Sequence, residues 1–181
     1  MLTPLNSSSA ELWIRRARRE DIPGILQLLR LCIDDMRRQG IDQWDDVYPT
    51  RENFKSDLAS SSLYVVGFEG ESILGAMTVN QHQDAEYAGA SWSIPAARVA
   101  VVHRLMVDPA SRGRGLARRL MEFAEDFAAA QGCDAMRLDA FALNPRALRL
   151  YHGLGYQEAG EITFRKGSFV CFEKRLRPQA W

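Results

Sequence analysis

The segment that most constrains the fold of this chain is residues 103–117, HRLMVDPASRGRGLA. It couples the apolar, strand-like run Leu105-Met106-Val107 to an arginine- and glycine-rich turn that opens directly into a helical pattern. Asp108-Pro109 ends the strand, because proline has no N–H to give to a strand ladder. Glycines let backbone amides approach a ligand, and the first amides of a helix lack internal acceptors. The segment therefore predicts a strand, an anion-binding loop suited to a polyphosphate, and a helix.

The helix predicted after this turn has an unusual charge order. Helices favour acidic residues in the first turn and basic residues in the last, whereas here the arginines come first and the acids follow. A solvated basic face is the alternative explanation, but the glycines and the preceding strand favour an anion site. The residues concerned are Arg112, Arg114, Arg118 and Arg119, followed by Glu122, Glu125 and Asp126.

Two blocks of the sequence resemble a known family. Arg112-Gly113-Arg114-Gly115-Leu116-Ala117 resembles the Arg/Gln-x-x-Gly-x-Gly/Ala signature of the GCN5-related N-acetyltransferases (GNAT). Residues 144–156, NPRALRLYHGLGY, resemble the later asparagine–tyrosine–glycine block of that family, in the family's order. The resemblance implies an N-acetyltransferase that uses acetyl-coenzyme A, with the coenzyme pyrophosphate bound by the backbone amides of the first block.

Composition and charge limit the function classes. The chain has 181 residues, enough for one domain with a substantial core, and its formal net charge is zero. This balance argues against nucleic-acid or membrane partners, and no apolar run is long enough to cross a bilayer. The three cysteines, Cys32, Cys133 and Cys171, form no zinc or disulfide pattern, so we expect no metal and a reducing, cytoplasmic location. Residues 1–10 lack a secretory signal, and we expect them to be a disordered tail before a single domain at 11–177.

Hydrophobic periodicity predicts alternating strands and helices in a mixed α/β layer fold. The early strands should pair antiparallel, with one helix-linked parallel pair, and the polar residues 81–97 should form a loop or irregular hairpin. Strands are expected at residues 12–16, 63–68, 72–80, 99–107, 136–141, 161–165 and 168–175, and helices at 22–39, 51–59, 116–130 and 145–154.

The family resemblance implies a specific version of this architecture. A mostly antiparallel sheet of about six to seven strands, flanked by about four helices, would contain a parallel pair that splays apart at a bulge. The pantetheine arm would lie in the resulting cleft and pair with the strand at 99–107 as an added strand does. This implies main-chain contacts from Leu105, Met106 and Val107 and a side-chain contact from Asn144. The side chains of Leu105 and Val107 are also expected to pack in the core.

Acetyl transfer from a thioester to an amine requires a neutral amine and a proton for the departing thiolate. Tyr151 stands where family members often place a tyrosine near the coenzyme sulfur, and its phenol can donate that proton. A packed aromatic with its hydroxyl at the surface is the alternative. The resemblance thus implies Tyr151 as the general acid.

The best candidate for the general base is His103, which resembles a histidine of the arylalkylamine acetyltransferases. Period-two alternation predicts that it shares a strand face with Leu105 and Val107, and histidine titrates in the useful range. A structural histidine, a water chain or the loop residues His82 and Glu86 are alternatives. Histone-type members carry a carboxylate where this chain has Val101, which argues against their mechanism.

The acceptor is expected to be an amine of a small molecule or peptide. Trp44, Tyr48 and Trp92 are candidates for the acceptor wall, with core or lid packing as the alternative. Asp139 is a candidate for binding a cationic substrate, and a strand-end aspartate bonded to nearby amides is the alternative. A non-catalytic acyl-coenzyme A sensor on the same fold is the competing function. Family members are often dimers, so a homodimer is one expected state, although no stripe in the sequence identifies an interface.

Overall fold

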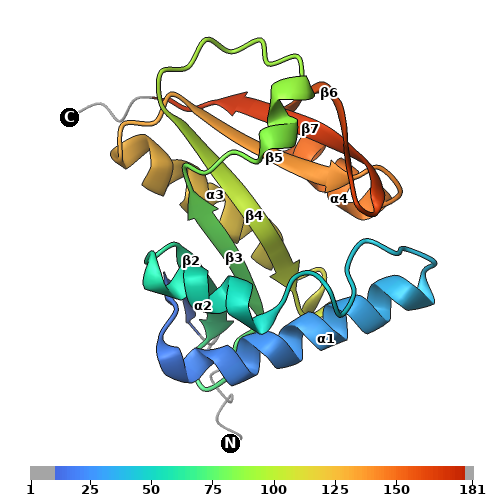
Figure 1. Cartoon of the computed structure of the whole chain (residues 1–181). Helices are drawn as coiled ribbons and strands as arrows, with labels where there is room; N and C mark the ends of the chain where they lie inside the picture. The colour runs from blue at the N-terminus through green and yellow to red at the C-terminus, as the bar shows by residue number, and fades with distance from the viewer. Residues whose placement is uncertain (1–10, 178–181) are drawn as a thin grey trace, which may run out of the picture.

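A computed structural model describes residues 11–177, which form one seven-stranded sheet with the strand order β1-β2-β3-β4-β5-β7-β6 (Figure 1). The predicted disordered tail at 1–10 lies outside the described residues. The strands are β1 (Leu12–Arg16), β2 (Leu63–Phe68), β3 (Gly75–Asn80), β4 (Val99–Val107), β5 (Ala135–Phe141), β6 (Gln157–Phe164) and β7 (Gly167–Arg175). The helices are α1 (Ile22–Arg38), α2 (Arg51–Ala59), α3 (Leu116–Ala130) and α4 (Pro145–Gly153).

The predicted fold class is confirmed. Every neighbouring pair of strands in the sheet is antiparallel except β4 and β5, which run parallel and are joined through α3. Helices α1 and α2 pack on one face of the sheet, and α3 and α4 contribute to the core on the other. Figure 1 shows α1 and α2 in front of the strands and α3 behind them.

Strand β2 explains how a continuous apolar run serves both layers. Leu63 and Val65 belong to the core under α1 and α2, whereas Tyr64 and Val66 belong to the core under α3. Alternate residues of a strand point to opposite faces, so a strand covered on both sides is apolar throughout. The sheet is therefore covered by helices on both faces in this region.

The parallel pair separates along its length. Strands β4 and β5 pair only from Val99 opposite Ala135 to Val101 opposite Arg137. Beyond this point the two strands diverge, as the V between them in Figure 1 shows. The second half of β4 thus has backbone groups on one side that are not paired with β5, because a strand needs a neighbour to satisfy both edges. The splayed pair that the family resemblance implied is confirmed.

A bulge in β4 corrects one prediction. His103 pairs with Thr78 and Met106 pairs with Ala76, so β4 has one more residue than β3 in this interval. The extra residue shifts the alternation of side chains. Met106, rather than Leu105 and Val107, therefore shares the face of His103. Leu105 and Val107 pack against the core on the opposite side.

Two further strands begin at other residues than predicted, whereas residues 81–97 form the predicted loop. Strand β3 begins at Gly75 rather than at residue 72, and β6 begins at Gln157 rather than at residue 161. The latter strand contains a register shift between Glu158 and Glu161, which interrupts the period-two pattern used to locate it. Residues 81–97 form a loop with one short 3₁₀ turn, Ala85–Gly89. Within the described part of the chain, no helix combines the length and apolar character needed to span a membrane.

Candidate active site

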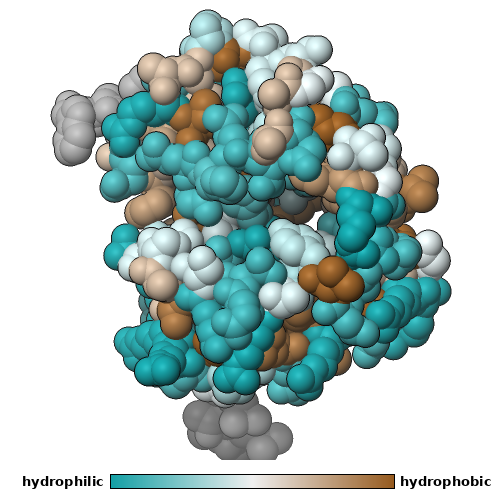
Figure 2. Space-filling view, in the orientation of Figure 1, coloured by the Kyte–Doolittle hydropathy of each residue, from teal (hydrophilic) through white to brown (hydrophobic). Residues whose placement is uncertain are grey.

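One large cleft crosses the molecule where β4 and β5 diverge. Its volume is about 1450 Å³, and Figure 2 shows the surface hollowed between the two halves of the molecule. The loop before α3 lines one end, and the segment with His82, Asp84 and Glu86 lines the other. Tyr151, from α4, and Asp139, from β5, also line it. The splayed sheet therefore brings residues of both sequence blocks and three of the four proposed acceptor residues to a single cavity.

The loop before α3 has the backbone geometry of an anion site. Gly113 and Gly115 have φ values of 81° and 76°, a conformation that glycine adopts without steric cost. Nothing lies within 4 Å of the position that a Cβ atom would take at either glycine. Gly115 is also the N-cap of α3 and provides no side-chain cap, so the first amides of this helix remain available to a ligand.

The arginine side chains of this loop are arranged differently from a simple cationic cluster. Arg112 lines the cleft and pairs with Asp35 of α1, and this guanidinium lowers the pKa of the carboxyl. Arg114 points away from the cleft, where it forms two hydrogen bonds of 3.0 and 3.1 Å with Glu71 and stacks on Phe68. Arg112 and Arg114 are thus each paired with a carboxylate, whereas Arg118 lines the cleft and donates to the carbonyl oxygen of Gly153 at 3.3 Å.

The predicted coenzyme-arm residues line the middle of the cleft. Leu105, Met106 and Val107 lie in the part of β4 beyond its pairing with β5. Asn144 caps α4 by accepting a hydrogen bond from the Ala147 amide at 3.2 Å, and its Nδ2 donates to Gln43 Oε1 at 2.9 Å. A ligand that accepts a hydrogen bond from Asn144 Nδ2 would therefore replace Gln43 as the acceptor.

Tyr151 lies in the wall of the cleft and is packed against Phe172 and Tyr156. Burial is the main cause that raises the pKa of its phenol, and the negative charge of Asp139 raises it further. Both effects disfavour the phenolate, so the hydroxyl carries its proton at neutral pH. The geometry allows Tyr151 to donate a proton to a group bound in the cleft.

Asp139 is a half-buried carboxyl at the splayed end of β5. Tyr87 Oη donates a hydrogen bond to its Oδ2 at 2.8 Å. Burial raises the pKa of Asp139 to about 6, an effect that the Tyr87 hydrogen bond partly opposes. The carboxyl is therefore mostly ionised at neutral pH but accepts a proton more readily than an exposed aspartate does.

His103 is held by two acceptors at one nitrogen. Its Nε2 lies 3.2 Å from Asn80 Oδ1 and 3.2 Å from the carbonyl oxygen of His82. Because both partners accept, the neutral ring carries its proton on Nε2, which leaves the lone pair on Nδ1. Burial, and then the adjacent Arg104 charge, lower the pKa of His103. The ring is therefore neutral at physiological pH and able to accept a proton.

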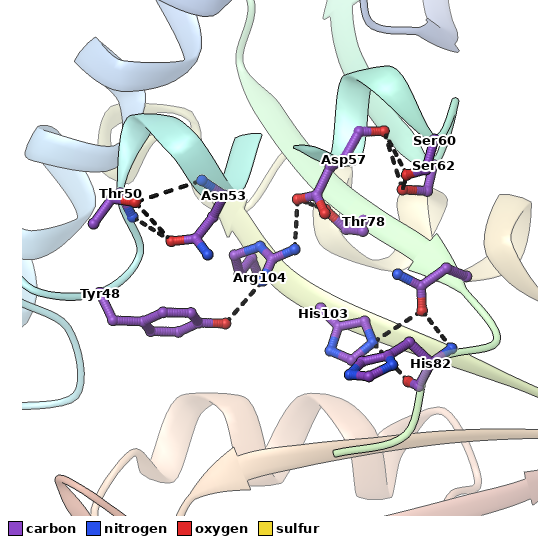
Figure 3. Close-up of polar contacts among 11 residues, drawn as sticks. Tyr48, Thr50, Asn53, Asp57, Ser60, Ser62, Thr78, His82, His103 and Arg104 are labelled. Atoms are coloured by element: carbon purple, nitrogen blue, oxygen red, sulfur yellow. Dashed lines mark hydrogen bonds and ion pairs between the residues drawn. The ribbon is translucent and has the colours of Figure 1, made fainter. Parts of the chain in front are cut away.

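An ion pair that the sequence analysis missed lies beside His103. Arg104 Nη2 donates to Asp57 Oδ2 at 2.5 Å, and Arg104 Nη1 donates to the Tyr48 hydroxyl at 2.9 Å (Figure 3). Thr78 Oγ1 donates to the same Asp57 oxygen at 2.8 Å. The one signal in the sequence was the charge of Arg104 within the mostly apolar strand β4. Nothing in the sequence connected this arginine to Asp57.

The proposed acceptor wall is only partly assembled. Trp44, Tyr48 and Asp139 line the cleft, with Trp44 also packed in the core beneath α1. Trp92 does not line it; its indole N–H donates to the carbonyl oxygen of Tyr87 at 2.8 Å, and its ring lies over Arg137. Packing accounts for Trp92. Among the described residues no group of His, Cys, Asp or Glu side chains is arranged to hold a metal ion.

Comparison with known proteins matches residues 27–156, well over half of the chain, to the acetyltransferase (GNAT) family. The chain belongs to the GNAT family. Two curated proteins match it over shorter stretches. An acetyltransferase from Agrobacterium fabrum is 38% identical over 77 residues, and an uncharacterized Mycobacterium leprae protein is 42% identical over 59 residues. The matches cover 41% and 33% of this chain, but only 55% and 16% of those two proteins.

Solved GNAT structures share the fold over almost the whole chain. A GNAT-family acetyltransferase from Streptococcus agalactiae superposes with a TM-score of 0.81 at 23% identity, covering 92% of this chain and 96% of that one. A putative acetyltransferase from Salmonella typhimurium, solved with acetyl-CoA, has a TM-score of 0.68 at 18% identity, covering 95% and 98%. At these identities the likeness establishes the fold alone.

Proposed function

We propose that this GNAT protein, with residues 11–177 as a single catalytic domain, transfers an acetyl group from acetyl-CoA to a primary amine by direct attack in a ternary complex. The acceptor is an amine of a small molecule or peptide. The observation that carries this proposal is the single cleft, which joins the glycine loop of α3, the unpaired half of β4 and the Tyr151 phenol.

The residues present fit the co-substrate. The loop amides from Arg112 through Gly113, Arg114, Gly115, Leu116 and Ala117 would bind the pyrophosphate, since the glycine conformations leave room for close approach. The free side of β4 at Leu105, Met106 and Val107 would pair with the amides of the pantetheine arm. The likeness to a fold that binds acetyl-CoA in the Salmonella protein supports this assignment.

The protein's own groups then handle two protons. Acetyl-CoA supplies a thioester whose carbon is attacked by the amine. Tyr151 holds its proton at neutral pH and donates it to the departing thiolate sulfur. Asp139 attracts the amine as an ammonium ion, which loses its extra proton to solvent before the neutral amine attacks. His103, with its lone pair on Nδ1, then accepts the proton that the nitrogen releases as the amide forms. Both residues line the cleft with Tyr151.

Calorimetric titration with acetyl-CoA, followed by a thiol-release assay across a panel of amines, tests the proposal. We expect micromolar binding and thiol release with one class of amine. Binding without release from any amine would instead support the acyl-CoA sensor. Absence of binding would refute the assignment of the glycine loop. Size-exclusion chromatography with light scattering, run on the same sample, would test the homodimer that we propose from the family.

A further inference from the structure

Arg104 is placed in the cleft by an unusual backbone conformation. It lies at the β4 bulge with φ of 52°, a left-handed region that residues with side chains rarely adopt. Glycine would adopt this conformation without steric cost, yet the chain has arginine there. An outlier of this kind at the edge of a cleft indicates a function for the side chain.

One end of the guanidinium is anchored. Only 11% of the Arg104 side chain is exposed, and only 10% of that of Asp57, its partner. The Asp57 oxygen that accepts from Arg104 also accepts from Thr78 on β3. This anchor balances the arginine charge and fixes the direction of the guanidinium, as Figure 3 shows.

The rest of the guanidinium has more donors than acceptors. A guanidinium has five N–H donors, and in the described part of the chain Arg104 bonds only to Asp57 and to the Tyr48 hydroxyl. The Tyr48 hydroxyl is a neutral acceptor, since burial raises its pKa. Arg104 Nε is buried and has no partner among the described residues. A carboxylate is a stronger acceptor than a phenol and matches the planar fork of arginine.

Several carboxylates line the same cleft as Arg104. Asp84, Glu86 and Asp139 line it together with Arg104 and Tyr48. The charges of Asp139 and Asp84 both contribute to the raised pKa of Tyr48, so these carboxylates lie within electrostatic range of the Arg104–Tyr48 pair. Asp139 also acts on Tyr151, the proposed acid. A molecule in this cleft therefore has access to both a guanidinium and several carboxylates.

We propose that the acceptor is zwitterionic, an amino acid or a close relative. Its carboxylate would bind Arg104, in place of or beside the Tyr48 hydroxyl, while its amine would face Asp139. The inference rests on the proposed function and assigns its acceptor class. Arg104 is then a substrate-binding residue that determines specificity.

The first test compares each free amino acid with its own amide in the thiol-release assay on the unmodified protein. The two differ in the carboxylate and in the basicity of the amine, so their values are compared as kcat/KM for the neutral amine. A charge-assisted bond corresponds to about 10- to 100-fold in this quantity. We expect at least one amino acid to exceed its amide by this factor. Equal values, or better use of the amides, would overturn the inference.

Variants locate the effect on Arg104. Arg104→Gln, made together with Asp57→Asn so that no buried carboxylate is left unpaired, should lower kcat/KM for the amino acid about 10- to 100-fold. The double variant should keep kcat/KM for the amide within a few-fold of the unmodified protein and should leave the affinity for acetyl-CoA unchanged. Arg51→Gln, an exposed arginine of α2, is the matched control and should change neither. Equal losses for the acid and the amide would refute the assignment.

Failure of the proposed function gives a different result. If no amine releases thiol, the protein is not the acetyltransferase proposed above. Calorimetric titration of the coenzyme A-saturated protein with the same amino acid and amide then decides the inference. Tighter binding of the acid, lost in the double variant, supports it, and equal or undetectable binding of both refutes it.

Discussion

Asp139→Asn should stabilise the protein at neutral pH while impairing its use of the amine. Burial raises the pKa of Asp139 from the ordinary value of 3.8 to about 6, so the folded state holds its ionised form at a cost. A pKa difference of about two corresponds to about 3 kcal/mol. Asparagine removes this charge and keeps an oxygen to accept from Tyr87, whose hydroxyl lies 2.8 Å from Oδ2. We therefore expect a gain in unfolding free energy of about 1 to 3 kcal/mol.

The sign of the effect depends on pH. The destabilisation by a raised carboxyl pKa is complete above about pH 6, shrinks between about pH 6 and the unfolded pKa of 3.8, and is lost below it. By linkage the cost is about 3 kcal/mol at about pH 7.5 and about 1 kcal/mol at about pH 4.5. The advantage of Asp139→Asn should therefore shrink by about 2 kcal/mol on acidification.

Urea denaturation of both proteins at these two pH values measures the difference. Asp126→Asn, at an exposed position of α3, is the matched control and should show no comparable change. In Asp139→Asn, KM for the amine acceptor should also rise, because the carboxylate that attracts the amine is gone. A stability gain independent of pH, or a loss at neutral pH, would contradict the assignment of Asp139 as a destabilising charge.

Three other substitutions test the site. Tyr151→Phe should lower kcat about 100-fold or more with little change in acetyl-CoA affinity, as measured by steady-state kinetics and calorimetry; full activity would exclude Tyr151 as the acid. Gly115→Glu should abolish acetyl-CoA binding. Gly155→Glu is the control, because it places a glutamate at a similar positive φ outside the loop, and it should retain binding. Equal losses of binding in both variants would indicate misfolding. His103→Ala should flatten the acidic limb of the kcat/KM profile, because the base acts when deprotonated; an unchanged limb would implicate another group.

Local sequence predicted much of the fold. The helix start at Leu116 follows Gly115, at a left-handed position that favours glycine, and the strands predicted at residues 161–165 and 168–175 meet in a tight turn just before Gly167. The positive φ at Gly115 and the tight turn before Gly167 both depend on neighbours along the chain, whose conformational preferences can be read from residue types. The splayed pair was implied by the family resemblance rather than by any local pattern, because strand pairing involves residues far apart in the sequence.

The candidate site was predictable only where it is local. The anion loop is one continuous segment, and the Tyr151 helix carries its own motif. Arg104 and Asp57 are 47 positions apart and meet because β4 and α2 pack together. Trp92, by contrast, is an aromatic in a loop whose sequence does not show which surface it covers.

The sequence by itself determined the α/β class, the order of the elements and the glycine loop, since each follows from short-range periodicity and backbone preference. The tertiary structure alone decided which side chains meet in the cleft. One extra residue in β4 moves Met106, rather than Leu105 and Val107, to the face of His103 and places Arg104 at the bulge. The register that produces this bulge is set by pairing with β3 and by packing on both faces of the sheet, interactions between residues distant in the chain.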